Sequence, residues 1–391
     1  MFAQYLNFVD FRINCQIEII LYKPSLKVLV FPLNHGILKR VQYYKLSKKF
    51  GKKALNWRTL IFIGELMHVR NKIHSIFHPE QFQGWTRKSN YFEGWYFKVV
   101  NSGEDKAFAI IPGIAIDKNG KGHAFIQVLD GKKRTAKYHK FELSSFIPSK
   151  SRFEIDIHNN HFSEKSLKIN LPEINGELHF SGNVTWPHKW YSPGIMGPYT
   201  FLPFMECYHG IVSLDHAITG QLKTESETLI FDKGRGYIEK DWGHSFPSAY
   251  VWLQSNHFSQ SGISVKVSVA KIPYHGYSFV GFIAGIWLGD RLIRFTTYNQ
   301  SKLIRSVIDF EKVDLVMQNK RYLLEIQARR EHSTALASPI LGLMDGRIEE
   351  SMNALVEVNL VDRKSGQTIF NDIGRNSGLE VAGKIKEISI F

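Results

Sequence analysis

The sequence predicts an all-β protein made of antiparallel sandwiches or barrels. After residue 80, apolar and polar residues alternate with the period of two that is typical of half-buried strands. Short turn sequences separate these segments, and the one convincing amphipathic helix is expected at 60–77, where the chain reads LIFIGELMHVRNKIHSIF. The chain has 391 residues, of which 43% are hydrophobic, and this is enough for two packed domains.

The predicted strands and turns follow one another along the chain. Strands are expected in four segments: RFEIDIHN (152–159), SLKINL (166–171), GISVKVSVAKI (262–272) and NALVEVNLVD (353–362). Turns are expected in five: NSGED (101–105), DKNGKG (117–122), DGKK (130–133), GD (289–290) and DRKSG (362–366).

A faint internal echo predicts two units. YFEGWYFKVVNSGEDKAFAII (91–111) opens with aromatic residues around Trp95, followed by a turn and a second strand. AYVWLQSNHFSQSGISVKVSV (249–269) follows the same scheme around Trp252. We therefore expect an N-terminal extension at 1–75, a first β domain at 76–245 and a second at 246–391.

Most of the positive charge belongs to the extension. The net charge is +14, and the segment from Gly36 to Lys72 contains ten Lys or Arg and one acid, Glu65. The rest of the chain is therefore only mildly basic, and no nucleic-acid partner is expected. The basic segment 37–72 is either a solvated tail or a contact with an anionic membrane surface.

Targeting and redox features are few. No run of about 18 uncharged apolar residues occurs, and the N-terminus lacks the order of a secretory signal. Cys15 and Cys207 provide no disulfide framework. These features predict a cytoplasmic protein, with membrane contact only at its periphery.

The first chemical motif is FEGWYF (92–97). On an alternating strand, Glu93 shares a face with Trp95 and Phe97, while Tyr96 lies on the other face. A carboxyl group desolvated by aromatic rings keeps its proton near neutral pH and can act as a general acid. The alternative is a core carboxylate that is paired with an Arg or a Lys.

The second motif is GYIEKDWGHSFPSAYVW (236–252). Glu239 and Asp241 share one strand face, so each carboxylate perturbs the titration of the other, and Lys240 points the other way. His244 is a candidate proton acceptor, and Trp242 and Trp252 are candidate binding residues. The alternative is a structural cluster of ion pairs.

The third motif is GPYTFLPFMECYHGIVSLDH (197–216). It holds Glu206, Cys207 and His209, but the spacing matches no standard zinc site, so no metal is expected. A serine-hydrolase elbow and phosphate-binding glycine loops are absent from the sequence.

These blocks resemble the tocopherol cyclase family. The resemblance rests on FEGWYF (92–97), YIEKDWGHSFPSAYVWLQSNHF (237–258) and YLLEIQARREHSTALASPI (322–340), and it covers the chain from about His78 to Gly383. It implies two lipocalin-like antiparallel β-barrels, because the family is distantly similar to carotenoid hydratases with that fold. The chain departs from plastid cyclases at Asp241–Ser245, where they carry an Asn-Trp-Gly-Gly-Gly run.

The resemblance also implies a reaction. Tocopherol cyclases close the chromanol ring by adding the phenol oxygen of a prenylated benzoquinol across a trisubstituted double bond, without a cofactor. The expected substrate is therefore a hydrophobic prenylated quinol or another isoprenoid. Two alternatives remain open: an isoprenoid or carotenoid hydratase, and a lipid carrier without catalytic activity.

The reaction assigns roles to the motif residues. Glu93 or Asp241 is expected to donate a proton to the double bond, and Glu239 or His244 to accept the phenol proton. Trp95, Tyr96, Trp242 and Trp252 are expected to stabilise the cation through their π faces, with Glu206 and His209 also at the binding site. The Glu93→Gln variant is expected to lose turnover and keep its melting temperature.

Overall fold

The structure, a computed structural model, describes residues 5–8, 17–20, 74–203, 205–274, 276–330 and 332–391. The chain divides into two compact units, Met1–Arg70 and Asn71–Phe391. In the first unit, the described residues form one antiparallel pair, β1 (Tyr5–Phe8) and β2 (Ile17–Ile20). The basic segment 37–72 and most of the helix predicted at 60–77 lie outside the described residues, and 74–77 are helical.

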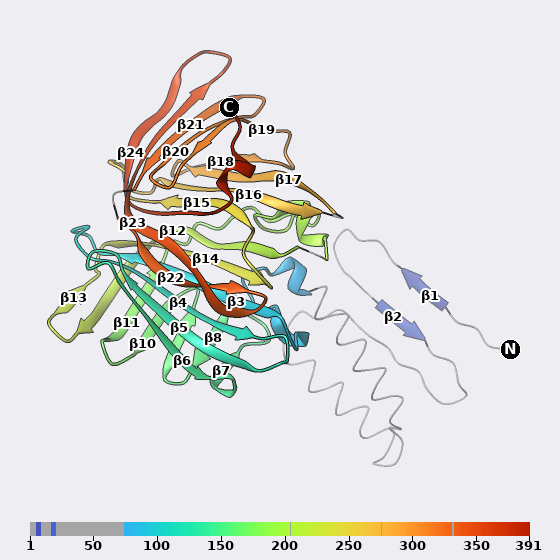
Figure 1. Cartoon of the computed structure of the whole chain (residues 1–391), viewed down its shortest axis with the longest axis vertical. Helices are drawn as coiled ribbons and strands as arrows, with labels where there is room; N and C mark the ends of the chain where they lie inside the picture. The colour runs from blue at the N-terminus through green and yellow to red at the C-terminus, as the bar shows by residue number, and fades with distance from the viewer. Residues whose placement is uncertain (1–4, 9–16, 21–73, 204, 275, 331) are drawn as a thin grey trace. The chain divides into compact units, whose positions relative to one another are not determined.

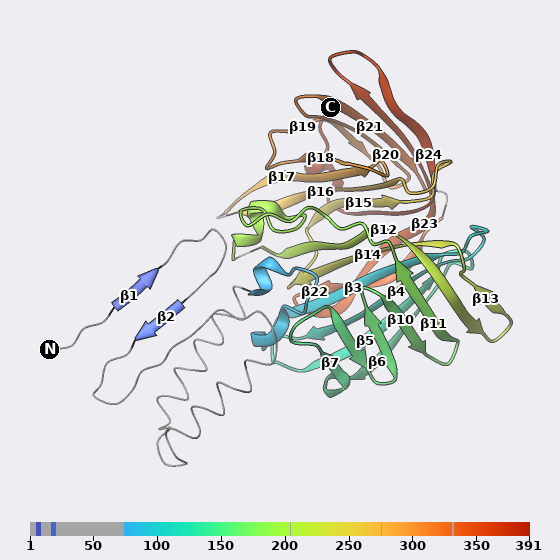
Figure 2. The same ribbon diagram turned by 180° about the vertical axis from the view of Figure 1, so that it is seen from behind.

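Two large antiparallel sheets make up the second unit, and they confirm the predicted all-β class (Figures 1 and 2). The first sheet has the strand order β6-β5-β4-β3-β14-β12-β11-β10-β9-β8-β7, with β13 paired to β12. Its strands are β3 (Tyr91–Val100), β4 (Ala107–Ile116), β5 (Gly122–Asp130), β6 (Thr135–Glu142), β7 (Phe146–Pro148), β8 (Glu154–Ile157), β9 (Asn160–Ser163), β10 (Ser166–Asn170), β11 (Ile174–Ser181), β12 (Cys207–Thr224), β13 (Thr228–Ile230) and β14 (Gly234–Gly243).

The second sheet has the order β18-β17-β16-β15-β24-β23-β21-β20-β19, with β22 paired to β23. Its strands are β15 (Ala249–Ser255), β16 (Ser264–Tyr274), β17 (Tyr277–Trp287), β18 (Leu292–Thr296), β19 (Lys302–Ile308), β20 (Lys312–Gln318), β21 (Tyr322–Arg329), β22 (Thr334–Ile340), β23 (Leu343–Asp362) and β24 (Thr368–Gly383). Short 3-10 turns are η1 (Gly84–Thr86), η2 (Leu143–Ser145), η3 (Gly197–Phe201) and η4 (Ile385–Ile388).

The predicted barrels are open sheets. Within the described residues, β6 does not pair with β7, and β18 does not pair with β19, so neither ring of hydrogen bonds closes. Side chains provide the enclosure in place of a continuous ladder, because each sheet packs its inner face into its own apolar cluster.

The internal echo reappears in the topology. The meander β3-β4-β5-β6 pairs through β3 with β14, and the meander β15-β16-β17-β18 pairs through β15 with β24. The last strand of the first sheet ends at Gly243, and the first strand of the second sheet begins at Ala249. The division into domains at 1–75, 76–245 and 246–391 stays a prediction.

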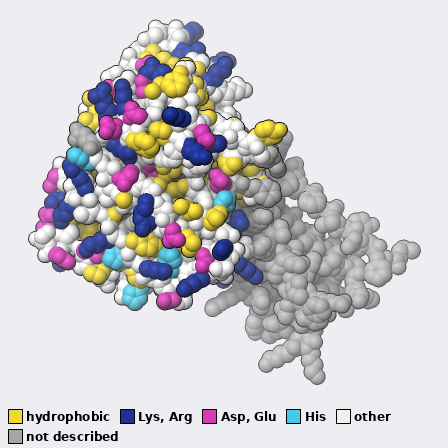
Figure 3. Space-filling model, in the orientation of Figure 1, with side chains coloured by type: hydrophobic (Ala, Val, Ile, Leu, Met, Phe, Trp, Pro, Cys, Tyr) yellow, Lys and Arg dark blue, Asp and Glu magenta, His cyan; other side chains and the backbone are white. Residues whose placement is uncertain are grey.

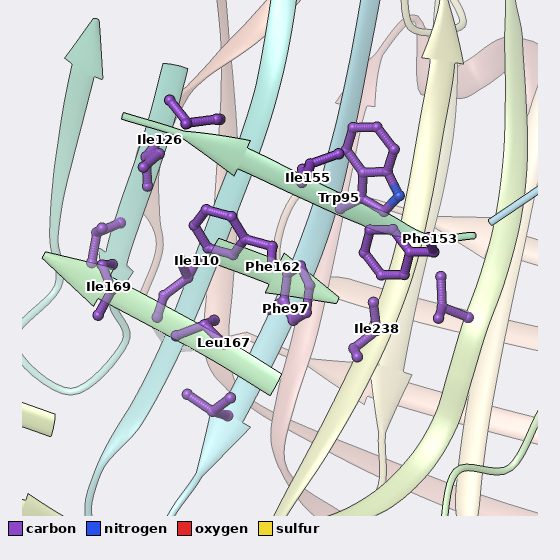
Figure 4. Packing of buried hydrophobic residues seen from close by; sticks show 14 of the residues in the cluster. Trp95, Phe97, Ile110, Ile126, Phe153, Ile155, Phe162, Leu167, Ile169 and Ile238 are labelled. Carbon is purple, nitrogen blue, oxygen red and sulfur yellow. The ribbon is translucent and has the colours of Figure 1, made fainter. Parts of the chain in front are cut away.

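Strand β3 is buried on both faces. Trp95 and Phe97 point into the apolar cluster of the first sheet, where the Trp95 ring stacks on Phe153 at 5.6 Å (Figure 4). The opposite face carries Tyr96, which packs with side chains of the second sheet, and its ring contacts Trp252 edge-on at 5.4 Å. The first sheet therefore contributes to two different interiors.

The hairpin of β22 and β23 extends from the second sheet over strands of the first (Figures 1 and 2). On β5, the Gln127 side chain accepts a hydrogen bond from the backbone N–H of Ala337 at 2.9 Å. This hairpin and strands β3 and β15 bound the space in which the candidate site lies.

Candidate functional site

A largely apolar cavity of about 190 Å³ lies between the two sheets. Both sheets contribute side chains to it, from β3, β4, β5, β12 and β14 on one side and from β15, β16, β17, β22, β23 and β24 on the other. Its apolar wall includes Phe92, Ile111, Phe125, Met196, Tyr199, Met205, Phe246, Ile272, Phe279, Phe282, Ile283, Leu336, Met344 and Ile348. A cavity of this composition suits a hydrophobic ligand with a few polar groups.

Polar side chains interrupt this wall on strands β12, β14 and β24. They are Cys207, His209, Glu239, Asp241 and Glu380. The prediction that Glu239 and Asp241 share a strand face is confirmed, since both line the cavity from β14. Lys240 points the other way, as predicted.

Glu239 is almost completely buried, and its carboxylate accepts two hydrogen bonds. The indole Nε1 of Trp252 donates a hydrogen bond to its Oε2 at 3.0 Å, and the Tyr237 hydroxyl donates to the same oxygen. Burial raises the pKa of Glu239, and the charge of Asp241 adds to the rise, while nearby His209 opposes it.

His209 lies between the two carboxylates of β14. Its Nδ1 is 2.7 Å from Oδ1 of Asp241, and its Nε2 is 3.6 Å from Oε2 of Glu239. These side chains meet because His209 and Asp241 are directly opposed in the ladder of β12 and β14. The imidazole can therefore carry a proton between a buried carboxylate and a partly exposed one.

The same three residues have the donor types of a cation site. One nitrogen or oxygen atom from each of His209, Glu239 and Asp241 lies within 4.8 Å of the others. The hydrogen bond between His209 and Asp241 already satisfies part of this set, and such a triad serves a shared proton as well as a metal ion.

The structure adds two buried carboxylates that the sequence reasoning missed, Glu350 on β23 and Glu380 on β24. The two are directly opposed in the ladder, and Trp252 opposes Glu380 on its other side. The Tyr250 hydroxyl donates to Glu380 at 2.9 Å, and the Tyr96 hydroxyl donates to Glu350. Glu380 lines the cavity, and Glu350 lies behind it.

Burial and neighbouring carboxyl groups raise the pKa values of these acids. Burial raises the pKa of Glu380 well above its usual value, and the neighbouring charges of Glu350 and Glu239 raise it further. Burial likewise raises the pKa of Glu350 to about 7, although the hydrogen bond from Tyr96 opposes the shift. Coupled carboxyl groups in one buried site do not all ionise together, so the group holds at least one proton at neutral pH.

A buried amine supplies the opposite charge. Lys266 on β16 is fully buried, and its Nζ donates to the Ser268 hydroxyl. Burial lowers its pKa to about 8, while Glu239 and Asp241 oppose the shift. At neutral pH this ammonium group favours ionised Glu239 over an ionised group farther away.

The predicted placement of Glu93 in the cavity is wrong. Its carboxylate is fully buried and ion-paired to Lys240 at 2.6 Å, and the Tyr91 hydroxyl donates to it at 2.6 Å. The backbone N–H groups of Gln83 and Gly84 donate at 2.9 and 3.0 Å. Glu93 is thus a fully satisfied core carboxylate, which is the alternative that the sequence left open.

The other predicted binding residues divide between the cavity and its surroundings. Tyr96, Trp252 and His209 line it. Trp95 and Trp242 lie in the core of the first sheet, on either side of the Lys240 ammonium group at 4.9 and 4.5 Å. They do not line the cavity, because they share strand faces with Glu93 and Lys240 rather than with Tyr96 and Asp241.

Glu206 and His244 also lie outside the cavity lining. The Glu206 carbonyl accepts the backbone N–H of His244 at 2.9 Å, so this bond joins the residue before β12 to the residue after β14. The predicted placement of Glu206 and His244 at the binding site is therefore wrong.

One sequence signal could have identified Glu380. On β24 its neighbours on the same face are Gly378 and Ala382, so small residues leave room around a carboxylate within an apolar strand. Glu350 carries no comparable signal, because it stands beside exposed Glu349 at the start of a polar stretch.

None of the helices in the described residues combines the length and the apolarity that crossing a bilayer requires. The described part of the chain is a two-sheet β protein with an apolar cavity, and the carboxyl groups Glu239 and Glu380 in its lining have raised pKa values. The family model described as "Tocopherol cyclase-like" matches residues 169–383, more than half of the chain. The chain belongs to this family, as the sequence motifs predicted.

Individual relatives are distant. The chain is 26% identical over 192 residues to "Probable tocopherol cyclase, chloroplastic" of Oryza sativa subsp. japonica, a match that covers 46% of this chain and 40% of the relative. It is 25% identical over 207 residues to "Tocopherol cyclase, chloroplastic" of Zea mays, with the same coverage. The chain therefore spans less than half the length of these curated relatives.

Among solved structures, the chain is similar to that of CghA, with 11% identity and a TM-score of 0.46. That similarity covers 75% of this chain and 88% of CghA.

Proposed function

We propose that this protein is an enzyme that cyclises a prenylated benzoquinol to a chromanol by acid catalysis. One observation carries the proposal: Glu380, whose environment favours its neutral form, lines an apolar cavity that also holds proton acceptors. Protonating a trisubstituted alkene requires a neutral acid, a dry pocket and electron-rich rings, and family membership supports this chemistry.

The proposed reaction transfers protons and no electrons. Glu380 donates its proton to one alkene carbon, and the phenol oxygen of the same molecule forms a C–O bond with the other. The phenol proton passes to Glu239 or to His209, which connects to Asp241. The π faces of Trp252 and Tyr96 stabilise the developing cation, by about 2 kcal/mol when desolvated.

This assignment replaces the sequence-based roles. Asp241 is proposed here as the final proton acceptor, after His209, and no longer as the proton donor. Its side chain is 23% exposed and is paired with His209. Neither the donor nor the acceptor needs a metal ion, so we expect a chelator to leave turnover unchanged.

A hydrophobic substrate also needs access from lipid. In three segments, an exposed apolar side chain stands two positions along the sequence from a residue that lines the cavity. The pairs are Phe201 and Tyr199, Tyr277 and Phe279, and Leu341 and Pro339, with the exposed residue named first. We call these three exposed side chains the apolar rim. On the face shown in Figure 3, apolar and charged side chains are mixed, which is usual for a surface in water. We propose that the rim contacts a membrane; the contact predicted for residues 37–72 remains a separate prediction.

The decisive experiment is incubation of the purified protein with prenylated quinols, with products analysed by mass and chirality. A chromanol of the substrate's mass is expected. A product heavier by one water molecule, which takes its oxygen from labelled solvent, would instead indicate a hydratase. Tight binding without any product would indicate a carrier.

Glu380→Gln tests the proton donor. We expect the rate of cyclisation to fall by about 10²–10⁴-fold, because an amide cannot protonate an alkene, while substrate binding persists. Glu357→Gln is the matched control, since Glu357 is exposed on the neighbouring strand β23. Full activity of Glu380→Gln would remove Glu380 from this role.

A further inference from the structure

Behind Glu380, a layer of buried polar side chains lies between the two sheets. We call Lys98, Gln254, Glu350 and His257 the polar layer, and each is at most 5% exposed. The Lys98 ammonium nitrogen donates to the Gln254 side-chain oxygen at 2.8 Å. Among the described residues, no carboxylate lies within ion-pair distance of Lys98, which is unusual for a fully buried lysine.

Several polar atoms of the layer lack protein partners. Within the described part of the chain, these buried atoms accept or donate no hydrogen bond: Oε2 of Glu350, Nε2 of Gln254, and both ring nitrogens of His257. Two further buried atoms outside the layer, Oδ1 of Asn256 and Oδ1 of Asn353, also have no hydrogen-bond partner among the described residues. Buried polar atoms are almost always paired, and water is the usual partner where the protein offers none.

The layer reaches the cavity at one end. Glu350 accepts a hydrogen bond from the hydroxyl of Tyr96, whose side chain lines the cavity. Glu350 also lies directly opposite Glu380, the proposed proton donor.

At its other end the layer approaches the surface. Lys132 is partly exposed, and its ammonium group donates to Oδ1 of Asn376 at 2.5 Å. Asn376 donates in turn to partly exposed Glu104 at 3.0 Å. The charge of Lys132 acts on both Lys98 and His257, so these groups lie within electrostatic reach of one another.

We propose that this polar layer, with ordered water between its side chains, is a proton relay that reloads the Glu350–Glu380 pair from solvent. The relay runs on the far side of the acids from the substrate, so reloading does not require water to enter the apolar cavity. Its use in catalysis depends on the proposed cyclisation, but its existence does not.

The proton balance of cyclisation requires such a path. In each turnover Glu380 loses one proton to carbon, and the phenol proton leaves through His209 and Asp241. One proton must therefore return to Glu380 before the next turnover, and one must leave Asp241 for solvent. The alkene π bond and the phenol O–H bond break, one C–H and one C–O bond form, and the remaining changes are proton transfers between O–H and N–H groups, so no net oxidation occurs.

The titration of the layer suits this role. Burial lowers the pKa of Lys98 to about 7, with Glu350 opposing and Lys132 assisting the shift. The pKa of Glu350, raised by burial, is also about 7, and the groups that act on it are Tyr96, Lys98 and Glu239. Donor and acceptor pKa values that match each other and the ambient pH favour rapid transfer in both directions.

The relay can be tested without substrate. Protonated buried carboxyl groups give a carbonyl stretching band in the infrared, which shifts when the proton is exchanged for deuterium. We expect the free enzyme to show this band at neutral pH, Glu350→Gln to reduce it, and rapid mixing with heavy water to give its exchange rate. Absence of the band from the wild-type protein would overturn the proposal.

Lys98→Met and Gln254→Leu interrupt the layer without touching the cavity. We expect each to slow carboxyl exchange by about tenfold or more, while Lys168→Met, at an exposed position of β10, leaves it unchanged. Lys98→Met removes a buried amine that lacks a counter-ion, so it should fold, and Gln254→Leu provides an independent second interruption. Exchange as fast as in the wild type in both folded variants would overturn the proposal.

With active enzyme, the same variants separate the relay from the chemistry. Lys98→Met should retain the single-turnover rate of enzyme that starts with its acid protonated, and lose steady-state rate by about tenfold. If the wild-type protein makes no product, the proposed function fails, while the exchange measurement still decides the relay.

Discussion

At the scale of single residues, Glu93 is distinguished by its ion pair with Lys240. An ammonium group at 2.6 Å, a phenol hydroxyl and two backbone N–H groups surround its carboxylate. Burial and the acidic neighbours of Glu380 raise its pKa and favour its neutral form, and its one hydroxyl donor, Tyr250, only partly opposes this shift. Two glutamates in aromatic surroundings therefore differ in their partners: donors and an ammonium group surround Glu93, whereas other carboxyl groups lie close to Glu380.

Glu93→Gln should therefore destabilise the protein. Replacing the carboxylate leaves Lys240 as a buried charge without its counter-ion, which costs about 3–5 kcal/mol of unfolding free energy. Urea unfolding of the variant measures this loss. An unchanged unfolding free energy, with activity abolished, would restore the original expectation that Glu93 is the proton donor.

Lys98 should make stability depend on pH. Its pKa of about 7 lies below the value of 10.5 for an exposed lysine, so between these values the unfolded chain binds a proton that the folded chain does not. The wild type should therefore gain stability relative to Lys98→Met as pH rises from 7 to 9, by at most about 1.4 kcal/mol per pH unit. Parallel unfolding curves of both proteins at pH 7, 8 and 9 check this, and a constant difference would contradict it.

At the scale of strands, β3 is distinguished by having two buried faces with different tasks. Its register with β14 is continuous from Phe92 to Val100, so no bulge occurs at Gly94. Gly94 instead lies opposite Gly113 of β4 and lines the cavity. The pair of glycines brings the two backbones and the Phe125 ring close together.

The two glycines should respond differently to alanine. A Cβ at Gly113 would lie 2.5 Å from the Glu93 carbonyl oxygen and 2.6 Å from the Phe125 ring, so Gly113→Ala should cost about 1–3 kcal/mol. A Cβ at Gly94 would have no neighbour nearer than 3.6 Å, so Gly94→Ala should retain full stability. Thermal unfolding of the two variants compares them directly, and equal losses would contradict the packing argument.

For the whole described unit, the cavity belongs to neither sheet alone. Residues from β3 and β14 meet residues from β15 and β24, and each sheet contributes both acids and aromatic side chains, so the complete lining is assembled only when the sheets pack together. The same arrangement leaves the cavity-lining segments with exposed ends, which form the apolar rim.

The apolar rim should bind lipid. Its segments, 187–203, 271–279 and 338–347, contain Lys189, Arg347 and Lys271, which is paired with Glu387, and a single acid, Asp345. The small excess of positive charge favours an anionic surface. Replacing Phe201, Tyr277 and Leu341 together by Ser should weaken binding to anionic vesicles by at least about tenfold in a sedimentation assay. Phe310→Ser, at an exposed turn between β19 and β20, is the control, and equal binding by all proteins would contradict the rim proposal.

The sequence by itself determined the all-β class, the strand positions, the shared face of Glu239 and Asp241, and the family, because alternation and local motifs are written in neighbouring residues. Only the tertiary structure decided which face of β3 meets the cavity. Periodicity separates the two faces of a strand, but both faces of β3 are buried, so the pattern does not say which one a ligand would touch. The pairing of Glu93 with Lys240 joins residues more than a hundred positions apart through the ladder of β3 and β14. The meeting of Glu239 with Glu350 and Glu380 joins residues of the two sheets that are also more than a hundred positions apart, and only the packing of the sheets brings them together.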